Sequence, residues 1–230
     1  MECAMEWIQK EPELRRLEEA LEEHPVHRGL AGASRDQMRK VVRRICEQEV
    51  FITRAMLKAV DLALAKHGED RFLLDMKASI VESKKDLLAT LLTTFGKTWG
   101  EVVHGVAPLP MCQVYAAVFT SIMATESKGT IALAMLVNLR AWSKMCHLIS
   151  VAASDVGPLP YLERFAKGLE EKNAAAFEEQ VRGVLAGVEP KDAFDYKSCL
   201  ASIHLLQYAE ATFFDGIVPN QASLAKYAMI

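Results

Sequence analysis

A single carboxylate at residue 49 interrupts an apolar helical stripe. Apolar residues recur at helical spacing along this segment, at Met38, Val42, Ile45, Ile52, Met56, Val60 and Ala63. Glu49 follows Ile45 by four residues and precedes Ile52 by three, so it shares their face. A desolvated carboxylate has a raised pKa and can act as a general acid or base near neutral pH. Alternatively, the helix is rotated so that Glu49 reaches water or pairs with a neighbouring arginine.

A second polar interruption is Asn138, which falls within a later apolar face. That face is marked by Ile131, Ala134, Met135, Met145 and Ile149. A buried amide needs partners, which can be a ligand, a backbone carbonyl or water. Trp142, four residues on, and Tyr115 and Phe119 on the preceding segment could wall the same cavity, or belong to an ordinary core.

The last long helical segment also carries polar residues beside its apolar face. That face consists of Leu200, Ile203, Gln207, Ala211 and Phe214. His204 and Tyr208 lie one turn apart at its edge, where a histidine is either a satisfied core residue or a functional group. Glu210 follows Leu206 by four residues and could face inward or outward.

Metal and thiol chemistry find little support in the sequence. Di-iron helical bundles need two Glu-x-x-His pairs, and only Glu101 and His104 form one. Cys112 lies near Tyr115, and Cys146 adjoins a histidine that points about 100° away on a helix. Cysteines in apolar helices are usually inert, so we expect no metal and no cofactor.

Charge and composition exclude several classes of partner. Hydrophobic residues make up 51% and charged residues 25% of the 230-residue chain, and the net charge is −3. This balance gives no cationic surface for nucleic acid or acidic lipid. Residues 131–139 are too few to span a bilayer, and Glu2 and Glu6 stand where a signal peptide needs basic residues. Five scattered cysteines without a CxxC motif favour a reduced, cytoplasmic protein.

Helical signals follow one another along the chain, and strand signals are almost absent. The sequence therefore predicts one all-α domain over residues 1–230. Ser34 and Gln37 predict a capping box at the start of the second helix, and Gly68 predicts its end. Long helices are expected over about 5–23, 35–67, 69–95 and 111–153, the last with a break near Lys128-Gly129. Short helices are expected from Tyr161 to Gly187, a long helix from Pro190 to about Asp215, and a tail helix after Ser223. Residues 96–110 are expected to form a connector.

The order of these features resembles a known family. His24-Pro25-Val26-His27, a glycine-containing turn at 29–34 and a long helix with Gln37 near its start look like the opening of the TenA/PqqC group. The segment 115–145 is similar to that group's middle helices, where a tyrosine-bearing helix and a glycine-containing bend precede an Ala/Leu-rich helix. The resemblance covers roughly residues 20–215 and implies a single-domain, haem-oxygenase-like helical bundle.

The resemblance also assigns positions to the site. Thiaminase-type members carry a nucleophilic cysteine in the Ala/Leu-rich helix, and Asn138 stands in its place, which implies a divergent member without that nucleophile. The family's aspartate corresponds to Glu49, or to Glu47 with a different gap, and its active-site tyrosine corresponds to Tyr115. Its glutamate on the last helix has no secure match, because Glu210 is close but out of register.

These observations favour a cofactor-independent enzyme of small-molecule metabolism with a pocket between helices. We expect Glu49, Asn138 and His204 to be catalytic, in a hydrolysis, isomerisation or cyclisation, and Tyr115, Phe119, Trp142 and Tyr208 to bind the substrate. The resemblance implies that the chain forms a homodimer or larger homo-oligomer.

Three alternatives remain open. One is a thiaminase-type aminopyrimidine hydrolase with a displaced catalytic group. Another is a non-catalytic binding or scaffold protein, in which the buried polar residues bond to each other and no cavity above about 300 Å³ lies nearby. The third is a di-iron oxidase.

Overall fold

The chain folds into an all-α bundle. The computed structural model describes residues 10–24, 26, 30, 32–187 and 195–217, and every regular element within them is helical, which confirms the predicted all-α class. The elements are α2 (Pro12–Glu22), α4 (Arg35–His67), α5 (Arg71–Phe95), α6 (Trp99–Gly105), α7 (Pro110–Thr125), α8 (Lys128–Ala152), α9 (Pro160–Ala166), the 3-10 turn η1 (Lys167–Leu169), α10 (Glu171–Ala186) and α11 (Tyr196–Ile217).

The longest helix, α4, begins at the predicted capping box. The Ser34 hydroxyl accepts a hydrogen bond from the Gln37 backbone N–H, and the Ser34 N–H donates to the Gln37 side-chain oxygen at 2.7 Å. These two bonds satisfy donors that a helix start otherwise leaves unpaired. Gly68, at φ 80°, ends the helix as predicted.

Removing this cap should weaken the fold measurably. Ser34→Ala deletes the acceptor and is expected to lower the free energy of unfolding by about 1 kcal/mol. Urea denaturation followed by circular dichroism measures the loss. Ser121→Ala, on the exposed side of α7, serves as the control and should change stability by less than about 0.5 kcal/mol. Equal stability of the two variants would contradict the role of the cap.

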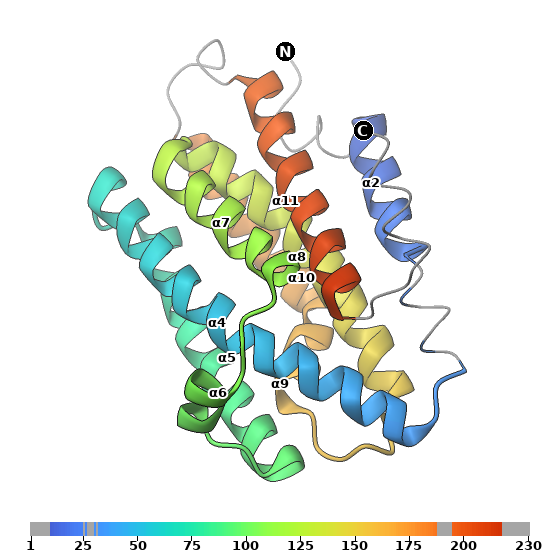
Figure 1. Ribbon diagram of the computed structural model, residues 1–230. Helices are drawn as coiled ribbons and strands as arrows, with labels where there is room; N and C mark the ends of the chain where they lie inside the picture. Colours follow the sequence, from blue (N-terminus) through green and yellow to red (C-terminus); the bar gives the residue numbers. More distant parts are fainter. Residues whose placement is uncertain (1–9, 25, 27–29, 31, 188–194, 218–230) are drawn as a thin grey trace.

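The helices pack around one long axis of the molecule. α4 packs against both α5 and α7, α7 packs against α11, and α8 packs against α9, α10 and α11. Figure 1 shows α4 and α5 running side by side, with α2 lying at the edge of the bundle next to α11. Glu49 on α4, Asn138 on α8 and Glu210 on α11 each lie near the middle of a helix. These three helices therefore bring their central residues into the interior.

The apolar core consists of two clusters. One contains Ile45, Val50 and Phe214, and the other contains Phe119, Met135 and Leu206. Met56 of α4 and Tyr115 of α7 pack against both clusters. The junction between the two clusters is thus the place where polar groups can meet inside the bundle.

The structure corrects one predicted segment and confirms another. Residues 96–110, predicted as a connector, contain the short helix α6, which a capping box between Thr98 and Glu101 begins. α7 ends at Thr125 and α8 starts at Lys128 with Ser127 as its N-cap, which confirms a break near Lys128-Gly129.

The predictions for the chain ends are tested only in part. α2 covers Pro12–Glu22, inside the predicted helix 5–23, whereas the predicted start near residue 5 and the tail after Ser223 lie outside the described residues. α11 begins at Tyr196, where the Asp195 side chain accepts the Lys197 and Ser198 backbone N–H groups; Pro190 lies outside the described residues.

Within the described part of the chain, no single helix is long and apolar enough to cross a membrane. Among the described helices, α6 and α7 taken together reach that length and composition, but they are bent by 109° at their junction.

Candidate functional site

Glu49 lies in the interior of the bundle, held by a tyrosine from another helix. Its side chain is 6% exposed, and the Tyr161 hydroxyl of α9 donates a hydrogen bond to Oε2 at 2.7 Å. Burial raises the pKa of Glu49 to about 7, although the bond from Tyr161 opposes the rise. The carboxyl group can therefore both give and accept a proton at neutral pH.

A second buried carboxyl group, Glu210, is held by a chain of hydrogen bonds. The Tyr115 hydroxyl donates to Asn138 Oδ1 at 2.8 Å, and Asn138 Nδ2 donates to Glu210 Oε2. Glu210 is 1% exposed, and its Oε1 has no hydrogen-bond partner among the described residues. Burial, and then repulsion by Glu49, raise the pKa of Glu210 well above its ordinary value.

Neither carboxyl group forms an ion pair with a basic side chain of the described residues. In the described ranges, the ion pairs involve other acidic residues, and no lysine, arginine or histidine pairs with Glu49 or Glu210. Two buried acids without a cation are costly to keep ionised together. A proton or a positively charged ligand would lower that cost.

Aromatic side chains close the space between the two acids. Trp142 of α8 meets Phe165 of α9 and Phe213 of α11 edge to face, with ring centroids 6.0 and 5.9 Å apart. Phe165 in turn meets Tyr161 at 5.2 Å. Together with the hydrogen-bonded residues, these rings line an inner cavity of about 50 Å³.

Two larger cavities follow the inner one toward the surface. A middle cavity of about 290 Å³ also touches Glu49, Met56 and Tyr161, and an outer cavity of about 630 Å³ opens beyond it. Leu139 and Phe165 line all three cavities. The site is therefore a row of three adjoining spaces with the carboxyl groups at its inner end.

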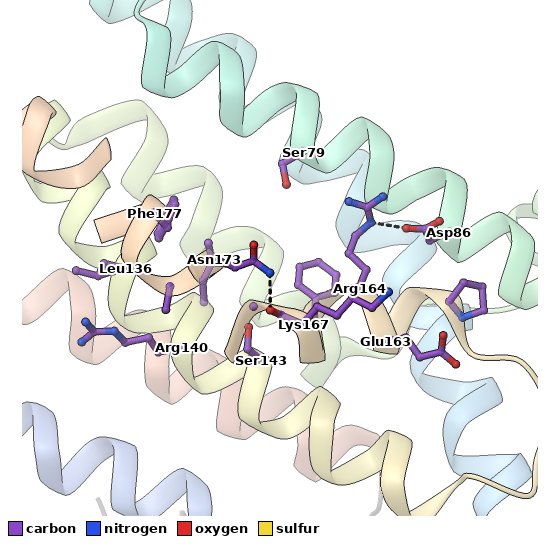
Figure 2. Close-up of a pocket in the computed structure, with 15 residues that line it drawn as sticks. Ser79, Asp86, Leu136, Arg140, Ser143, Glu163, Arg164, Lys167, Asn173 and Phe177 are labelled. Atoms are coloured by element: carbon purple, nitrogen blue, oxygen red, sulfur yellow. Dashed lines mark hydrogen bonds and ion pairs between the residues drawn. The ribbon is translucent and has the colours of Figure 1, made fainter. Parts of the chain in front are cut away.

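Charged residues surround the outer cavity. Arg164 of α9 pairs with Asp86 of α5, and Arg140 of α8 pairs with Glu178 of α10. Figure 2 shows the Arg164–Asp86 pair on one side of this cavity, and Asn173 donating to the Lys167 carbonyl at 2.8 Å. These contacts join the helices that form the walls.

Four of the predicted site residues meet at the inner cavity: Glu49, Asn138, Tyr115 and Trp142. Phe119 lines the middle cavity instead. The alternative family match, Glu47, lies outside the three cavities, where Arg43 Nε is 3.4 Å from its Oε1.

The other two predicted residues do not join the site. His204 lies 3.7 Å from Glu13 of α2, and Tyr208 is 47% exposed on α11. Neither lines any of the three cavities. His24, from the motif that carried the family resemblance, lies against Asp215 in the last turn of α11, with Nε2 and Oδ1 3.3 Å apart.

Sequence reasoning missed Tyr161, Phe165 and Phe213, and it left the direction of Glu210 open. The only local signal for Tyr161 is its place in the first turn of a short helix that begins at a proline. A buried tyrosine hydroxyl needs a partner, but the sequence does not name a partner 112 residues away.

The described residues offer neither a metal site nor an activated thiol. They contain no group of three or more histidine, cysteine, aspartate or glutamate side chains placed to hold a metal ion. Burial raises the pKa of Cys112 to about 12, and that of Cys146 rises well above its ordinary value. The chemistry this arrangement can perform is proton transfer by Glu49 and binding of a cation or hydrogen-bond donor by the two acids.

No protein-family model matches this chain, and no curated protein matches it.

Proposed function

We propose that this protein is a cofactor-independent enzyme that acts on a small molecule containing a basic nitrogen. The observation that carries the proposal is the pair of buried carboxyl groups, Glu49 and Glu210, which face one cavity to which the described residues contribute no basic side chain. A substrate with an amine or amidine nitrogen would supply the missing positive charge or hydrogen-bond donors. The reaction would be a hydrolysis, isomerisation or cyclisation that needs only proton transfer.

The residues have distinct parts in this proposal. Glu49 acts as general acid or base, because its pKa lies near 7. Tyr161 fixes the orientation of Glu49. Asn138 uses its oxygen for Tyr115 and its nitrogen for Glu210, so it is a positioning residue for Glu210. We further propose that the bundle is a TenA/PqqC-like, haem-oxygenase-like scaffold, as the sequence resemblance implies.

A purely structural role fits the site less well. A self-satisfied polar core would leave no acceptor unpaired, yet Glu210 Oε1 has no partner among the described residues. It would also be close-packed, whereas cavities of about 290 and 630 Å³ continue from the inner one. The paired bonds of Asn138 alone would suit a scaffold protein, but the space beside them supports a ligand.

The test compares three forms of the protein on a mixture of natural small molecules. Wild type, Glu49→Gln and Glu47→Gln are incubated with the small-molecule fraction of a cell extract, and mass spectrometry follows each compound. Glu47 is the matched control, because it lies on the same helix but pairs with Arg43 outside the cavities. We expect wild type and Glu47→Gln to consume the same nitrogen-containing compound, and Glu49→Gln to leave it intact. Identical profiles for all three would refute the proposal.

A more specific candidate is an aminopyrimidine hydrolase of the thiaminase type. The carboxyl pair favours it, because an aminopyrimidine presents both a ring nitrogen and an amino group to acids. Incubation with thiamine and with its aminopyrimidine breakdown product tests this candidate. Release of hydroxymethyl-pyrimidine from either supports it, and no release from both removes it.

A further inference from the structure

We propose that the ligand of this site has two parts: a small polar head at Glu49 and Glu210, and an apolar arm that fills the middle cavity. The inference rests on the proposed function for the head, and on the shape and lining of the cavities for the arm. It narrows the substrate class to amphiphilic nitrogen compounds, such as an alkyl or aryl amine.

The inner cavity is too small to hold a complete substrate. Its volume of about 50 Å³ is about a third of the roughly 150 Å³ of a cavity that holds one benzene molecule. Trp142, Phe165 and Phe213 enclose it. Only the reacting head of a ligand fits between the two acids, so the remainder must continue into an adjoining space.

The middle cavity is the space that adjoins this head. It shares Glu49, Met56 and Tyr161 with the inner cavity, and its volume is about 290 Å³. This is about twice the volume of the benzene-holding cavity, so the middle cavity has room for roughly ten non-hydrogen atoms. Natural protein interiors have few voids larger than one water molecule, so a space of this size is unusual for plain packing. Its size and position suit the arm of a ligand.

The lining of the middle cavity selects an apolar arm. Most of its wall is made of aromatic and aliphatic side chains, contributed by α5, α7, α8 and α10: Phe72, Met76, Ile80, Phe119, Met135 and Phe177. The Ser83 hydroxyl donates a hydrogen bond to the Ile80 carbonyl at 2.9 Å, and Asp75 pairs with Arg71. The exposed Ser79 and Gln180 lie at the rim. Beyond Glu49, Tyr161 and the buried Thr53, then, the wall gives a polar arm little to bind.

The outer cavity provides one way in. It adjoins the middle cavity at Leu139, Phe165 and Phe177, and it reaches the surface beside exposed Lys167 and Asn173. Figure 2 shows Phe177 and Ser79 at this cavity, and both also line the middle one. The charged head of the ligand would cross the polar outer cavity first and reach the two acids, and the apolar arm behind it would then lie in the middle cavity.

A series of n-alkylamines, from ethylamine to dodecylamine, tests the arm. Isothermal titration calorimetry measures the dissociation constant of each amine, below its micellar concentration, with the full-length protein. We expect affinity to rise about fourfold for each added methylene until the middle cavity is full, near octylamine to decylamine, and then to level off. An affinity that does not depend on chain length would overturn the proposal, as would a rise that continues through dodecylamine.

Variants locate the arm. Ser83→Phe fills part of the middle cavity and should make the series level off several carbons earlier. Ser121→Phe, the same change on exposed α7, and Asn173→Phe, in the outer cavity, should both follow wild type. Met76→Trp is a second filling variant, used if Ser83→Phe fails to fold by circular dichroism. Filling variants that follow the wild-type series would place the arm elsewhere and refute the proposal.

Matched n-alkanols separate this inference from the proposed function. Amines that bind tighter than alkanols of equal length, with the difference lost in Glu49→Gln, support both. If amines and alkanols of equal length bind equally, and the affinity of both rises with chain length, the apolar arm is supported and the basic head is refuted. If amines bind more tightly than alkanols but affinity does not change with chain length, the basic head is supported and the apolar arm is refuted.

Discussion

Replacing Glu49 by glutamine is expected to raise the free energy of unfolding by roughly 3 kcal/mol at pH 8. The physical reason is the cost of holding a carboxylate in the interior. In the folded protein the pKa of Glu49 is about 7, against an ordinary value of 4.5. The glutamine amide carries no charge at any pH between 5 and 8. It retains an oxygen to accept the Tyr161 bond and can direct its nitrogen into the inner cavity.

The sign and the pH window follow from the raised pKa. Below about pH 4.5 the carboxyl group is protonated in both the folded and unfolded states, so no charge is buried and the free energy of unfolding is not lowered. Between about pH 4.5 and 7 the unfolded state loses its proton first, and stability falls as pH rises. Above about pH 7 both states are ionised and the loss is constant. The advantage of Glu49→Gln should therefore shrink to less than about 1 kcal/mol at pH 5.

Urea denaturation at pH 5, 6, 7 and 8 measures this effect. Glu47→Gln is the matched control, because Glu47 is also buried on α4 but pairs with Arg43. It should give no stability gain that grows with pH. A Glu49→Gln variant whose stability tracks wild type across the whole range would show that the carboxylate is not desolvated. A gain in stability on removing a group needed for activity is typical of a functional site.

The helices were predictable wherever their ends depend on nearby residues. Ser34 and Gln37 are three residues apart, and their reciprocal hydrogen bonds need nothing from the rest of the protein. The short helix α6 went unpredicted, although Thr98 and Glu101 carry the same signal, because seven residues containing two glycines are typical of a connector. The haem-oxygenase-like topology depends on helix packing and remains a proposal.

The candidate site was predictable only in part, for a geometric reason. Glu49 and Asn138 interrupt stripes that point inward, so their burial follows from spacing along one helix. On α11 buried residues occur on most of the surface, and the stripe does not fix the inward direction. His204 was expected inside and lies toward α2, whereas Glu210 lies fully inside.

Residues that join the site only through tertiary contacts could not be predicted. Tyr161 reaches Glu49 across 112 residues of sequence, because α9 packs against both α5 and α8. Phe165 follows it by one helical turn and therefore faces the same cavity. No local pattern specifies which helix such a segment will cover, so the inner cavity becomes visible only in the folded chain.

Asn138→Leu is expected to lower the free energy of unfolding by about 2 to 4 kcal/mol at pH 8. Asn138 is the link between the Tyr115 hydroxyl and the Glu210 carboxyl group, and leucine can bond to neither. The change would leave both Glu210 oxygens without partners, since Oε1 already has none among the described residues. Burial keeps this cost high, because Glu210 is only 1% exposed and water cannot replace the lost partner freely.

A double-mutant cycle separates this loss from simple misfit of the new side chain. Glu210→Met removes the carboxyl group, so adding Asn138→Leu to it should cost at least about 1 kcal/mol less than Asn138→Leu costs in wild type. Asn173→Leu, at an exposed amide of α10, is the control and should change stability by less than about 1 kcal/mol. Additive costs at Asn138 and Glu210 would mean that the amide does not support the acid. In that case the loss caused by Asn138→Leu would come from the misfit of leucine at this buried position.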